Sequence, residues 1–587
     1  MFDIDHPRSL VQALQANAAS TTRGLTFIGD DRSEVLVPFA ELLGDVARGA
    51  GALAGHGIEP GDRVALVVPD TREFVTGFLA IVWLGAIPVP LYPPTSLGKQ
   101  DAYLDFLGSV LSSSGSRALI APQWVDEVLN LSVRFGEQVA VVVHTETVTA
   151  GGDYVDAAPR STDQITFLQF TSGSTGKPKA VQVTDASLWA NTHSFLTNLR
   201  CLEAQKYPTE RFVSWLPLYH DMGLIGHFLS VVLFGLQATY LPTLAFLRSP
   251  GIWLDAVSRH RGTVSFAPNF AFALTVKKAK APQAEEAGWD FSSMRVFGCG
   301  AEPINADVLD AFIDAYARYG LKQEAVMPAY GMAEATLAIT FDNVERRFQR
   351  LPISGAAYRN EGLVVPASAK GQDTADDVLT FVSCGRALDD RHAVRIVHDA
   401  GHELAEGRVG DVHFHGPSVA AGYFENEEVT RNAFGADGWL RTGDRGFVVD
   451  GNLYITGRKK DILVVNGRNY DPQQVEWAVE EVPGIRKGNV VAFSVPGDIT
   501  EKVVIAAERT GREEDQIAVQ IAGIRRSVSD RTRLALADVV LLQPGQLPKT
   551  SSGKVQRSRT RDLYVQGVLG DSVVATRTHA HVDPVTV

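Results

Sequence analysis

Short runs of β-branched residues alternate with amphipathic helical stretches along this 587-residue chain. The run Arg63–Val68 is predicted to be a buried strand, and Asp70 follows it as a candidate helix N-cap. Apolar residues at helical spacing then predict an amphipathic helix: Val75, Phe78, Leu79 and Val82. The runs Ile165–Phe170 and Met294–Phe297 likewise lead from a strand into a loop. This alternation predicts an α/β fold whose helices pack over largely parallel sheets.

Composition and charge narrow the classes of protein to which the chain can belong. Hydrophobic residues make up 45% of the chain and charged residues 21%, which is typical of a globular protein and excludes a mostly disordered one. With 55 basic and 68 acidic residues, the formal net charge is −13, which argues against a protein that follows a nucleic-acid backbone. The three cysteines, Cys201, Cys299 and Cys384, lie far apart. They form neither a disulfide framework nor a CxxC metal cluster, and they fit a reducing compartment.

The sequence shows no sign of secretion or membrane insertion. Its first ten residues, MFDIDHPRSL, lack the basic and apolar regions of a signal peptide. The most apolar stretches are Phe78–Leu91, which contains two prolines, and Phe228–Leu236, which is short. Neither reaches the roughly 18 apolar residues that a membrane span needs. We expect a cytoplasmic enzyme without a membrane span.

The composition changes near residue 455, where a basic, glycine-flanked segment begins. A helix is predicted soon after this segment, with Asp471 as its N-cap. We place the main domain boundary at Lys460. This gives a large N-terminal domain, 1–460, and a small α+β C-terminal domain, 461–587. The last residues, 571–587, show no helical period and are predicted to form a loose tail.

A polar, glycine-rich loop follows the predicted strand Ile165–Phe170. Residues 171–177 read TSGSTGK, and small residues beside a lysine suit a polyphosphate because they free backbone N–H groups. The loop is not a Walker motif, because only two residues separate Gly173 from Gly176 and Pro178 follows the lysine. The simpler alternative is a polar hairpin turn.

Seven motifs occur in a fixed order and carry a family resemblance. They are TSGSTGKPK (171–179), SWLPLYHDMGLIG (214–226), GAEPI (300–304), YGMAEAT (330–336), GWLRTGD (438–444), GRKKDIL (457–463) and LPKTSSGK (547–554). Together they resemble the adenylate-forming superfamily of acyl-CoA synthetases, luciferases and peptide-synthetase adenylation domains. The motifs PLYHDMGLIG, YGMAEAT and NGRNYDPQQVE are similar to those of the fatty acyl-AMP ligase branch.

The resemblance implies an acyl-adenylate synthetase fold with a mobile C-terminal domain and a reaction in two halves. A medium- or long-chain fatty acid attacks the α-phosphate of ATP, giving acyl-AMP and pyrophosphate, with Mg²⁺ on the phosphates. The acyl group then passes to the phosphopantetheine thiol of an acyl carrier protein, or of a carrier domain in a polyketide or peptide synthase. Such a ligase would serve lipid or polyketide biosynthesis.

The resemblance also implies a nucleotide site. Thr171–Lys177 would close over the β- and γ-phosphates, and Tyr330 would stack on adenine against Gly300–Pro303. The nucleotide-binding residues are Thr171, Ser172, Gly173, Ser174, Thr175, Gly176, Lys177, Gly300, Ala301, Glu302, Pro303, Tyr330, Gly331, Met332, Ala333, Asp444 and Arg458. Many superfamily members carry Thr at the position of Ala333, where its hydroxyl contacts the α-phosphate. The fatty acyl-AMP ligase branch has Ala there, as this chain does. One phosphate contact is therefore left unassigned.

Further roles follow from the same motifs. Glu334 would bind Mg²⁺, and Asp444 would accept hydrogen bonds from the ribose hydroxyls. Lys554 would bridge the substrate carboxylate and the α-phosphate. Lys460 would act as the hinge between the domains. Lys554, Arg458 and His220 are the candidate catalytic residues, and we expect His220 to position the acyl and phosphate groups rather than to transfer a proton.

Each of these residues has a simpler structural alternative. Tyr330 fits a core aromatic residue, Glu334 a surface helix, Asp444 an ordinary turn and Lys554 a solvated loop. Only the joint pattern favours a site.

Three functions remain open on the sequence: a fatty acyl-AMP ligase, an acyl-CoA synthetase, and a non-enzymatic acyl-adenylate-binding protein. Gly385 follows Glu334 by 51 residues, more than is usual in acyl-CoA synthetases. The extra material, about 346–374, resembles the insertion that marks acyl-AMP ligases, although a tolerated surface loop is the alternative. We expect its apolar residues to dock against the large domain and to restrict the swing of the C-terminal domain into a CoA-competent pose.

Overall fold

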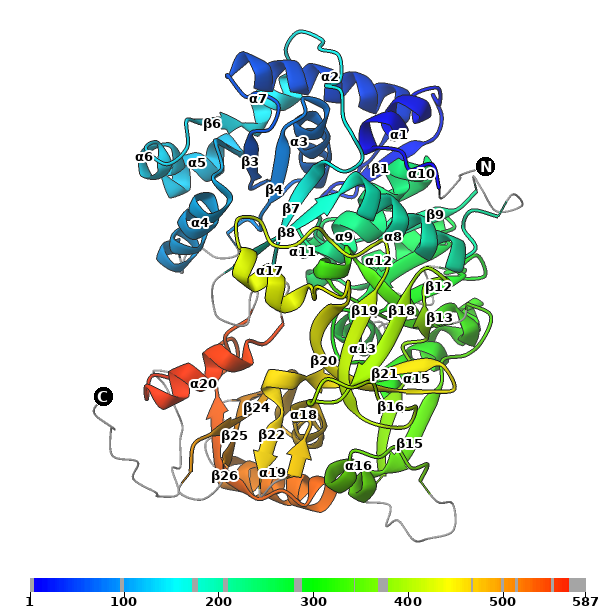
Figure 1. The fold of residues 1–587 in the computed structure, drawn as a ribbon, viewed down its shortest axis with the longest axis vertical. Coiled ribbons are helices and arrows are strands. Elements are labelled where there is room, and N and C mark those ends of the chain that lie inside the picture. The colour runs from blue at the N-terminus through cyan, green and yellow to red at the C-terminus, as the bar shows by residue number, and fades with distance from the viewer. Residues whose placement is uncertain are drawn as a thin grey trace. The chain divides into compact units, whose positions relative to one another are not determined.

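The computed structural model describes residues 5–94, 100–171, 178–203, 209–278, 288–342, 344–367, 378–465, 468–497, 501–511, 516–549 and 554–569. Helices alternate with strands in it, and the nine-stranded sheet and one four-stranded sheet of the N-terminal part are mostly or wholly parallel, which confirms the predicted α/β class (Figure 1). The chain divides into two compact units, which are described separately. The first comprises 1–348, 384–394 and 413–442, and the second comprises 349–383, 395–412 and 443–587.

A nine-stranded sheet forms the centre of the first unit, in the order β17-β14-β13-β12-β11-β9-β10-β1-β2. The six strands from β13 to β1 are parallel. At the edges, β2 and β14 run antiparallel to them, and β17 pairs antiparallel with β14. The strands are β1 (Gly24–Ile28), β2 (Glu34–Pro38), β9 (Arg211–Ser214), β10 (Gln237–Tyr240), β11 (Val264–Ala267), β12 (Val296–Cys299), β13 (Val326–Gly331), β14 (Ala338–Phe341) and β17 (Arg386–Ala387).

A second, parallel sheet in this unit has the order β4-β3-β5-β6, and β7 and β8 form a separate antiparallel hairpin. The predicted run from Arg63 is strand β3, and helix α3 follows it. The Asp70 carboxylate accepts hydrogen bonds from the backbone N–H groups of Arg72 and Glu73, which confirms the predicted N-cap. The strands are β3 (Arg63–Leu66), β4 (Ile87–Pro90), β5 (Ala118–Ala121), β6 (Val141–His144), β7 (Ile165–Thr171) and β8 (Lys179–Thr184).

Helices of the first unit cover these sheets. Helix α3 packs against β3 and β4, and α2 packs on α3 (Figure 1). The helices are α1 (Leu10–Asn17), α2 (Phe39–Gly55), α3 (Thr71–Trp83), α4 (Gln100–Ser114), α5 (Gln123–Leu129), α6 (Leu131–Phe135), α7 (Thr145–Ala150), α8 (Asp185–Asn198), α9 (Asp221–Gly223), the π-helix η2 (Leu224–Leu229), α10 (Ser230–Phe234), α11 (Thr243–Arg248), α12 (Gly251–Arg259), α13 (Asn269–Lys278), α15 (Ala306–Tyr316), η3 (Ala317–Tyr319), η4 (Gln323–Ala325), η5 (Ala333–Ala335) and α17 (Glu427–Ala433).

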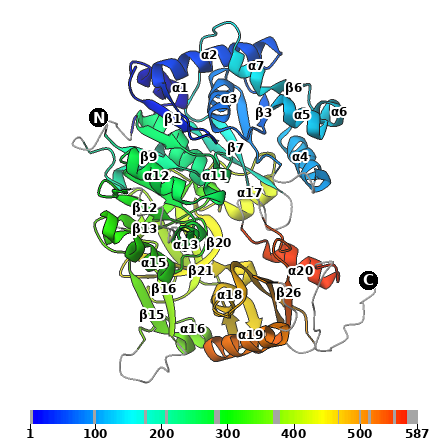
Figure 2. The same ribbon diagram turned by 180° about the vertical axis from the view of Figure 1, so that it is seen from behind.

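The second unit is built from smaller sheets. Strands β24, β25 and β26 form a mixed sheet, and helices α18 and α19 pack together on it (Figures 1 and 2). This unit also contains two two-stranded antiparallel sheets, β15-β16 and β22-β23. The elements are β15 (Arg350–Ser354), α16 (Gly355–Glu361), β16 (Val378–Val382), η7 (Lys459–Asp461), β22 (Leu463–Val465), β23 (Arg468–Tyr470), α18 (Pro472–Glu480), β24 (Ile485–Val495), β25 (Lys502–Arg509), α19 (Ile517–Thr532), β26 (Leu536–Leu542) and α20 (Arg557–Val565). A further sheet has the order β18-β19-β20-β21, with β18 (Ala393–Val397), β19 (Gly410–His415), β20 (Leu440–Val449) and β21 (Asn452–Arg458).

The predicted helix after residue 467 is α18, with Pro472 as its first residue. Asp471 occupies the N-cap position, but its side chain does not cap the helix, because it accepts a hydrogen bond from the Tyr358 hydroxyl instead. The predicted boundary residue Lys460 lies in η7, inside the second unit. A pivot of the chain at Lys460 stays a prediction. The predicted tail 571–587 lies outside the described residues.

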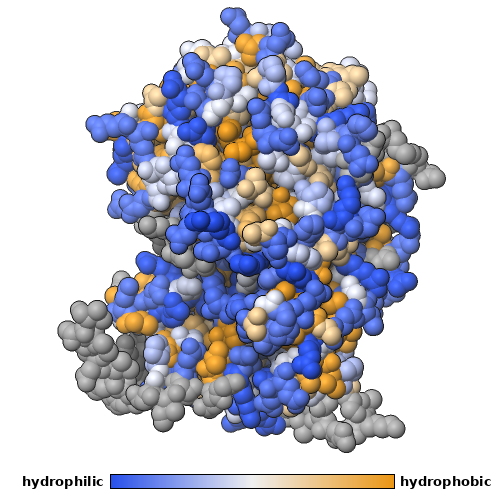
Figure 3. Space-filling view, in the orientation of Figure 1, coloured by the Kyte–Doolittle hydropathy of each residue, from blue (hydrophilic) through white to orange (hydrophobic). Residues whose placement is uncertain are grey.

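Two features concern membranes: the distribution of hydrophobic residues on the surface, and the length and hydrophobicity of the helices. On the face drawn in Figure 3, hydrophobic residues are scattered among hydrophilic ones. Within the described ranges, no helix is both long enough and apolar enough to cross a membrane.

Candidate active site

Two of the predicted nucleotide-binding segments follow neighbouring parallel strands. Gly300–Pro303 follows β12. Tyr330–Ala333 lies at the end of β13, with Tyr330 and Gly331 as the last two residues of that strand, and β13 pairs with β12 in parallel register. A Cβ atom on Gly300 would lie 3.1 Å from the carbonyl oxygen of Ala329, so the two segments lie close together. The carboxyl ends of parallel strands are the usual place for ligand sites in α/β sheets.

The Gly300–Pro303 segment is held in an unusual local shape. Ala301 has a φ of +67°, a left-handed value that is uncommon outside glycine. The Glu302 carboxylate accepts a hydrogen bond from the backbone N–H of Phe270, at 2.5 Å from its Oε1. Glu302 therefore shapes the loop through a main-chain contact.

The segment after β13 turns sharply, and glycine is required at the turn. A Cβ atom on Gly331 would lie 2.0 Å from the carbonyl oxygen of Leu337, which is shorter than any real contact. The Met332 N–H donates to that same carbonyl at 2.8 Å. Thr336 has a φ of +67°, and its hydroxyl donates to the Ser418 carbonyl at 2.7 Å. These bonds fix the short helix η5, which carries Glu334.

Tyr423, which the sequence motifs do not single out, holds the Glu334 carboxylate. Its hydroxyl donates to Glu334 Oε1 at 2.7 Å, and the Ala420 N–H donates to the Glu334 main-chain oxygen at 3.0 Å. The ring of Tyr423 lies 5.1 Å from the Lys179 ammonium nitrogen, a cation–π contact. The mostly buried Glu334 side chain is therefore linked through one tyrosine to the β7–β8 hairpin.

Strands β7 and β8 flank the glycine-rich segment in the sequence. Thr171 ends β7 and pairs with Lys179 at the start of β8, while residues 172–177 lie outside the described residues. Gln169 on β7 donates through Nε2 to the carbonyl oxygen of Tyr219 at 3.0 Å. This bond ties the hairpin to the segment that carries His220, which is partly buried and stands at the N-cap of α9.

The second unit brings two further predicted residues together. Asp444 on β20 and Arg458 on β21 are cross-strand partners, and Arg458 Nε lies 2.8 Å from Asp444 Oδ1. The Asp444 side chain is 7% exposed and that of Arg458 is 52% exposed. Lys459 forms ion pairs of 2.7 Å with both Asp399 and Asp411, and these hydrogen bonds raise the pKa of its ammonium group.

The remaining predicted residues of this unit are exposed. Lys460 lies in the middle of η7, directly after Lys459. Lys554 lies three residues before α20, beside the antiparallel bridge that joins Lys549 to Val555.

The donor set around Glu334 fits a magnesium ion that is held mainly by substrate. Among the residues that the structure describes, no three His, Cys, Asp or Glu side chains cluster as a metal site. Mg²⁺ in nucleotide enzymes needs only one or two carboxylates in addition to phosphate oxygens and water. Glu334 supplies one such carboxylate, with one oxygen already oriented by Tyr423.

The site can be compared with known proteins. Residues 15–424 match the AMP-binding enzyme family. A Caulobacter vibrioides protein whose name assigns it to the acyl-CoA synthetases is 35% identical over 569 residues, which are 96% of each chain. The medium-chain-fatty-acid–[acyl-carrier-protein] ligase JamA of Moorena producens is 29% identical, again over 96% of each chain.

A solved structure gives the same fold. It comes from a study of fatty acyl-adenylate ligases from E. coli and L. pneumophila, and it is 32% identical with a TM-score of 0.87. The match covers 97% of this chain and 99% of that chain. The chain therefore belongs to the AMP-binding enzyme family and is an adenylate-forming ligase related to the fatty acyl-AMP ligases.

Proposed function

We propose that this ligase activates a medium- or long-chain fatty acid as acyl-AMP and passes it to the phosphopantetheine arm of a carrier protein. The observation that carries the proposal is that the two segments predicted to bind the nucleotide lie at the ends of the paired strands β12 and β13, with Glu334 held beside them. The names of JamA and of the fatty acyl-adenylate ligases support a fatty acid as substrate. The name of JamA also supports a carrier protein as acceptor.

In the first half-reaction, a carboxylate oxygen of the fatty acid attacks the α-phosphorus of ATP. The bond from that phosphorus to the bridging oxygen of the β-phosphate breaks, and pyrophosphate leaves. Negative charge gathers on the phosphoryl oxygens in the transition state, so positioned cations accelerate the step. Lys554 is the cation assigned to this task, and it is an exposed residue three positions before α20.

The other residues bind and orient ATP. Thr171 and the loop after it cradle the terminal phosphates, and Tyr330 lies along adenine against Gly300–Pro303. Asp444 accepts hydrogen bonds from the ribose hydroxyls, and its pairing with Arg458 keeps this carboxylate oriented. Glu334 would hold Mg²⁺, which neutralises phosphate charge when it is bound.

In the second half-reaction, the phosphopantetheine sulfur attacks the acyl carbon after losing its proton. The bond from that carbon to the phosphate oxygen breaks, and AMP leaves. The C-terminal domain turns at Lys460 between the two halves, so Lys554 serves only the first. This assignment separates the two half-reactions experimentally.

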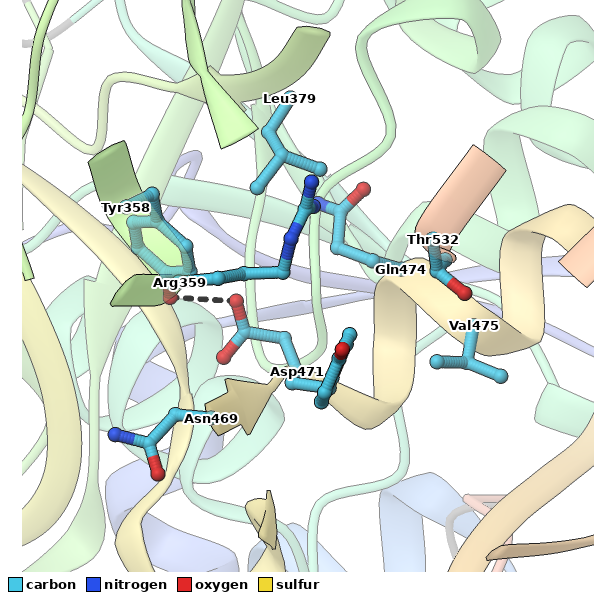
Figure 4. Close-up of a pocket in the computed structure, with 9 residues that line it drawn as sticks. Tyr358, Arg359, Leu379, Asn469, Asp471, Gln474, Val475 and Thr532 are labelled. Carbon is cyan, nitrogen blue, oxygen red and sulfur yellow. Dashed lines mark hydrogen bonds between the residues drawn. The ribbon is translucent and has the colours of Figure 1, made fainter. Parts of the chain in front are cut away.

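The insertion is proposed to disfavour coenzyme A as acceptor, and its contacts support this role. Ile353 and Tyr358 pack with Phe447 and Tyr454 of the β20–β21 hairpin. The Tyr358 hydroxyl also donates to Asp471 at 2.6 Å, and both residues line a small cavity (Figure 4). The insertion thus touches the chain both before and after residue 460, and it resists a turn at that point.

Product analysis tests the proposal. The protein is incubated with ATP, Mg²⁺ and a C12 fatty acid, alone, with CoA, or with a phosphopantetheinylated carrier protein, and the products are separated by chromatography. We expect acyl-AMP without an acceptor, a loaded carrier, and little acyl-CoA. Pyrophosphate exchange with amino or aryl acids but not with fatty acids would overturn the substrate assignment.

The second candidate function is an acyl-CoA synthetase, which the name of the Caulobacter vibrioides relative favours. Efficient acyl-CoA formation by the wild type would establish it and would leave the insertion as a surface loop. Replacing the insertion by a short Gly/Ser bridge tests its role, because a folded deletion variant should form more acyl-CoA per acyl-AMP. A CoA-inactive wild type with an equally inactive deletion variant would reject this role of the insertion alone.

A further inference from the structure

A buried ion-pair cluster lies directly after the Lys554 segment. Arg557, the first residue of α20, makes three contacts through its guanidinium group. Its Nη1 lies 2.9 Å from Asp461 Oδ2, its Nη2 lies 2.6 Å from Glu476 Oε1, and its Nε donates to the Ala492 carbonyl at 2.9 Å. The cluster therefore joins the start of α20 to η7, to helix α18 and to strand β24.

Burial makes this cluster rigid. The side chains of Arg557, Asp461 and Glu476 are only 23%, 16% and 6% exposed. A buried charge is tolerated only when its partners are well placed, and a planar guanidinium group fixes several partners at once. Glu476 Oε1 also accepts a hydrogen bond from the Ala492 N–H at 2.9 Å, which completes the cluster.

The chain on the other side of Lys554 is anchored as well. Lys549 Nζ donates to Asn489 Oδ1 at 2.6 Å. The fully buried Glu508 accepts hydrogen bonds through Oε1 from the N–H groups of Gly545 and Leu547, at 2.9 and 3.0 Å. Both ends of the segment that carries Lys554 are thus fastened to the β24–β25 sheet.

We propose that Arg557 is a positioning residue that locks Lys554 to Asp461, the residue directly after the pivot. The inference rests on the proposed function, in which Lys554 assists adenylation and the chain turns at Lys460. With the lock intact, a rotation at residue 460 carries Lys554 as one rigid piece. Without it, α20 and Lys554 lose their fixed distance from the pivot, and the ammonium group meets the α-phosphate less accurately.

Asp461→Ala is the sharpest test, because it breaks the contact beside the pivot and leaves Arg557 paired with Glu476. We expect kcat for acyl-AMP formation to fall about tenfold or more, since small misplacements of catalytic groups are costly. Transfer of the acyl group from synthetic acyl-AMP to the carrier protein should keep its rate, because Lys554 has no part in it. The KM for ATP should change little.

A matched control and a second variant complete the experiment. Glu481→Ala removes an exposed ion pair with Arg531 in the same unit and should leave both half-reactions unchanged. Arg557→Lys keeps a positive charge beside Glu476 but cannot form all three contacts, so it should reproduce the selective loss. Thermal unfolding of each variant shows whether it is folded.

The outcomes are distinct. Normal adenylation by folded Asp461→Ala and Arg557→Lys variants would overturn the inference, and so would an equal loss of both half-reactions. If the wild type forms no acyl-AMP from fatty acids, or if Lys554→Ala has no effect, the proposed function itself fails instead.

Discussion

At the scale of single residues, Glu334, which is assigned to Mg²⁺, and Asp444, which is assigned to the ribose, have different partners. Glu334 accepts from a neutral tyrosine hydroxyl, which leaves its negative charge available to a cation. Asp444 is paired with the Arg458 guanidinium group, which orients a carboxylate that can accept hydrogen bonds from ribose hydroxyls. Residues that orient a metal-binding carboxylate matter almost as much as the carboxylate itself.

Tyr423→Phe should therefore weaken the use of Mg²⁺. The variant removes the hydroxyl that orients Glu334 but keeps the ring beside Lys179. We expect a loss of about tenfold or more in apparent metal affinity, the usual cost of losing such a partner. Mn²⁺ binding to the nucleotide complex, followed by electron paramagnetic resonance, measures it directly. Tyr316→Phe is the control, since that buried hydroxyl donates to the Thr275 carbonyl at 3.2 Å; equal effects of both substitutions would contradict this role.

Lys554→Ala should abolish adenylation while the protein stays folded. The side chain is exposed, so its truncation should cost little stability. If the ammonium group acts only in the transition state, kcat should fall by about 100-fold or more. Pyrophosphate release with a C12 fatty acid measures the rate, and thermal unfolding checks the fold. Near-normal acyl-AMP formation would assign the role to another group.

At the scale of elements, helices can be predicted from local sequence signals, whereas contacts between distant residues cannot. Helices α3 and α18 were predictable because their first residues and their apolar spacing are local features. The link from Tyr423 to Glu334 spans 89 residues and has no local signal. The same holds for Asp471: its sequence position suggests a helix cap, whereas tertiary packing gives it Tyr358 as a partner.

The pair of Tyr358 and Asp471 should make stability depend on pH. Burial raises the pKa of Asp471 from 3.8 to about 7, although the Tyr358 hydrogen bond and the charges of Arg445 and Arg359 oppose the shift. Because the folded state holds this proton more tightly than the unfolded state, the contribution of Asp471 is greatest below about pH 4. It declines as the pH rises to about 7.

Asp471→Asn removes this titration. The midpoint of thermal unfolding of the variant, minus that of the wild type, should therefore rise between about pH 4 and pH 7 and then level off. Tyr358→Phe removes a contact that lowers the pKa of Asp471, so it should extend the decline to higher pH. A difference between Asp471→Asn and wild type that is constant with pH would show that Asp471 does not titrate in this range.

At the scale of the whole molecule, each compact unit is formed by several segments that are not consecutive in the sequence. The second unit collects 349–383 and 395–412 in addition to the C-terminal residues from 443. A change of composition near residue 455 cannot reveal the two earlier segments, because their assignment depends on contacts with distant strands. The motifs nevertheless predicted where β12 and β13 end, because glycine and proline mark loops directly in the sequence.

The proposed rotation at Lys460 gives the last prediction. Lys460→Pro fixes φ, removes a backbone N–H and disfavours the helical conformation of Lys459, which pairs with Asp399 and Asp411 in this structure. A hinge residue must change its backbone angles between two states, so the proline variant should favour one of them. Adenylation and acyl transfer should then be slowed unequally.

The two rates are measured separately, as fatty-acid-dependent pyrophosphate release and as transfer from synthetic acyl-AMP to the carrier protein. Lys460→Ala is the matched variant, because it removes the side chain and leaves the backbone free to turn. An unequal loss confined to the proline variant identifies backbone rotation as the cause. Equal slowing of both half-reactions in a folded Lys460→Pro protein would count against domain alternation. If each half-reaction needs a different domain orientation, a protein locked in one orientation must lose more of the half-reaction that needs the other.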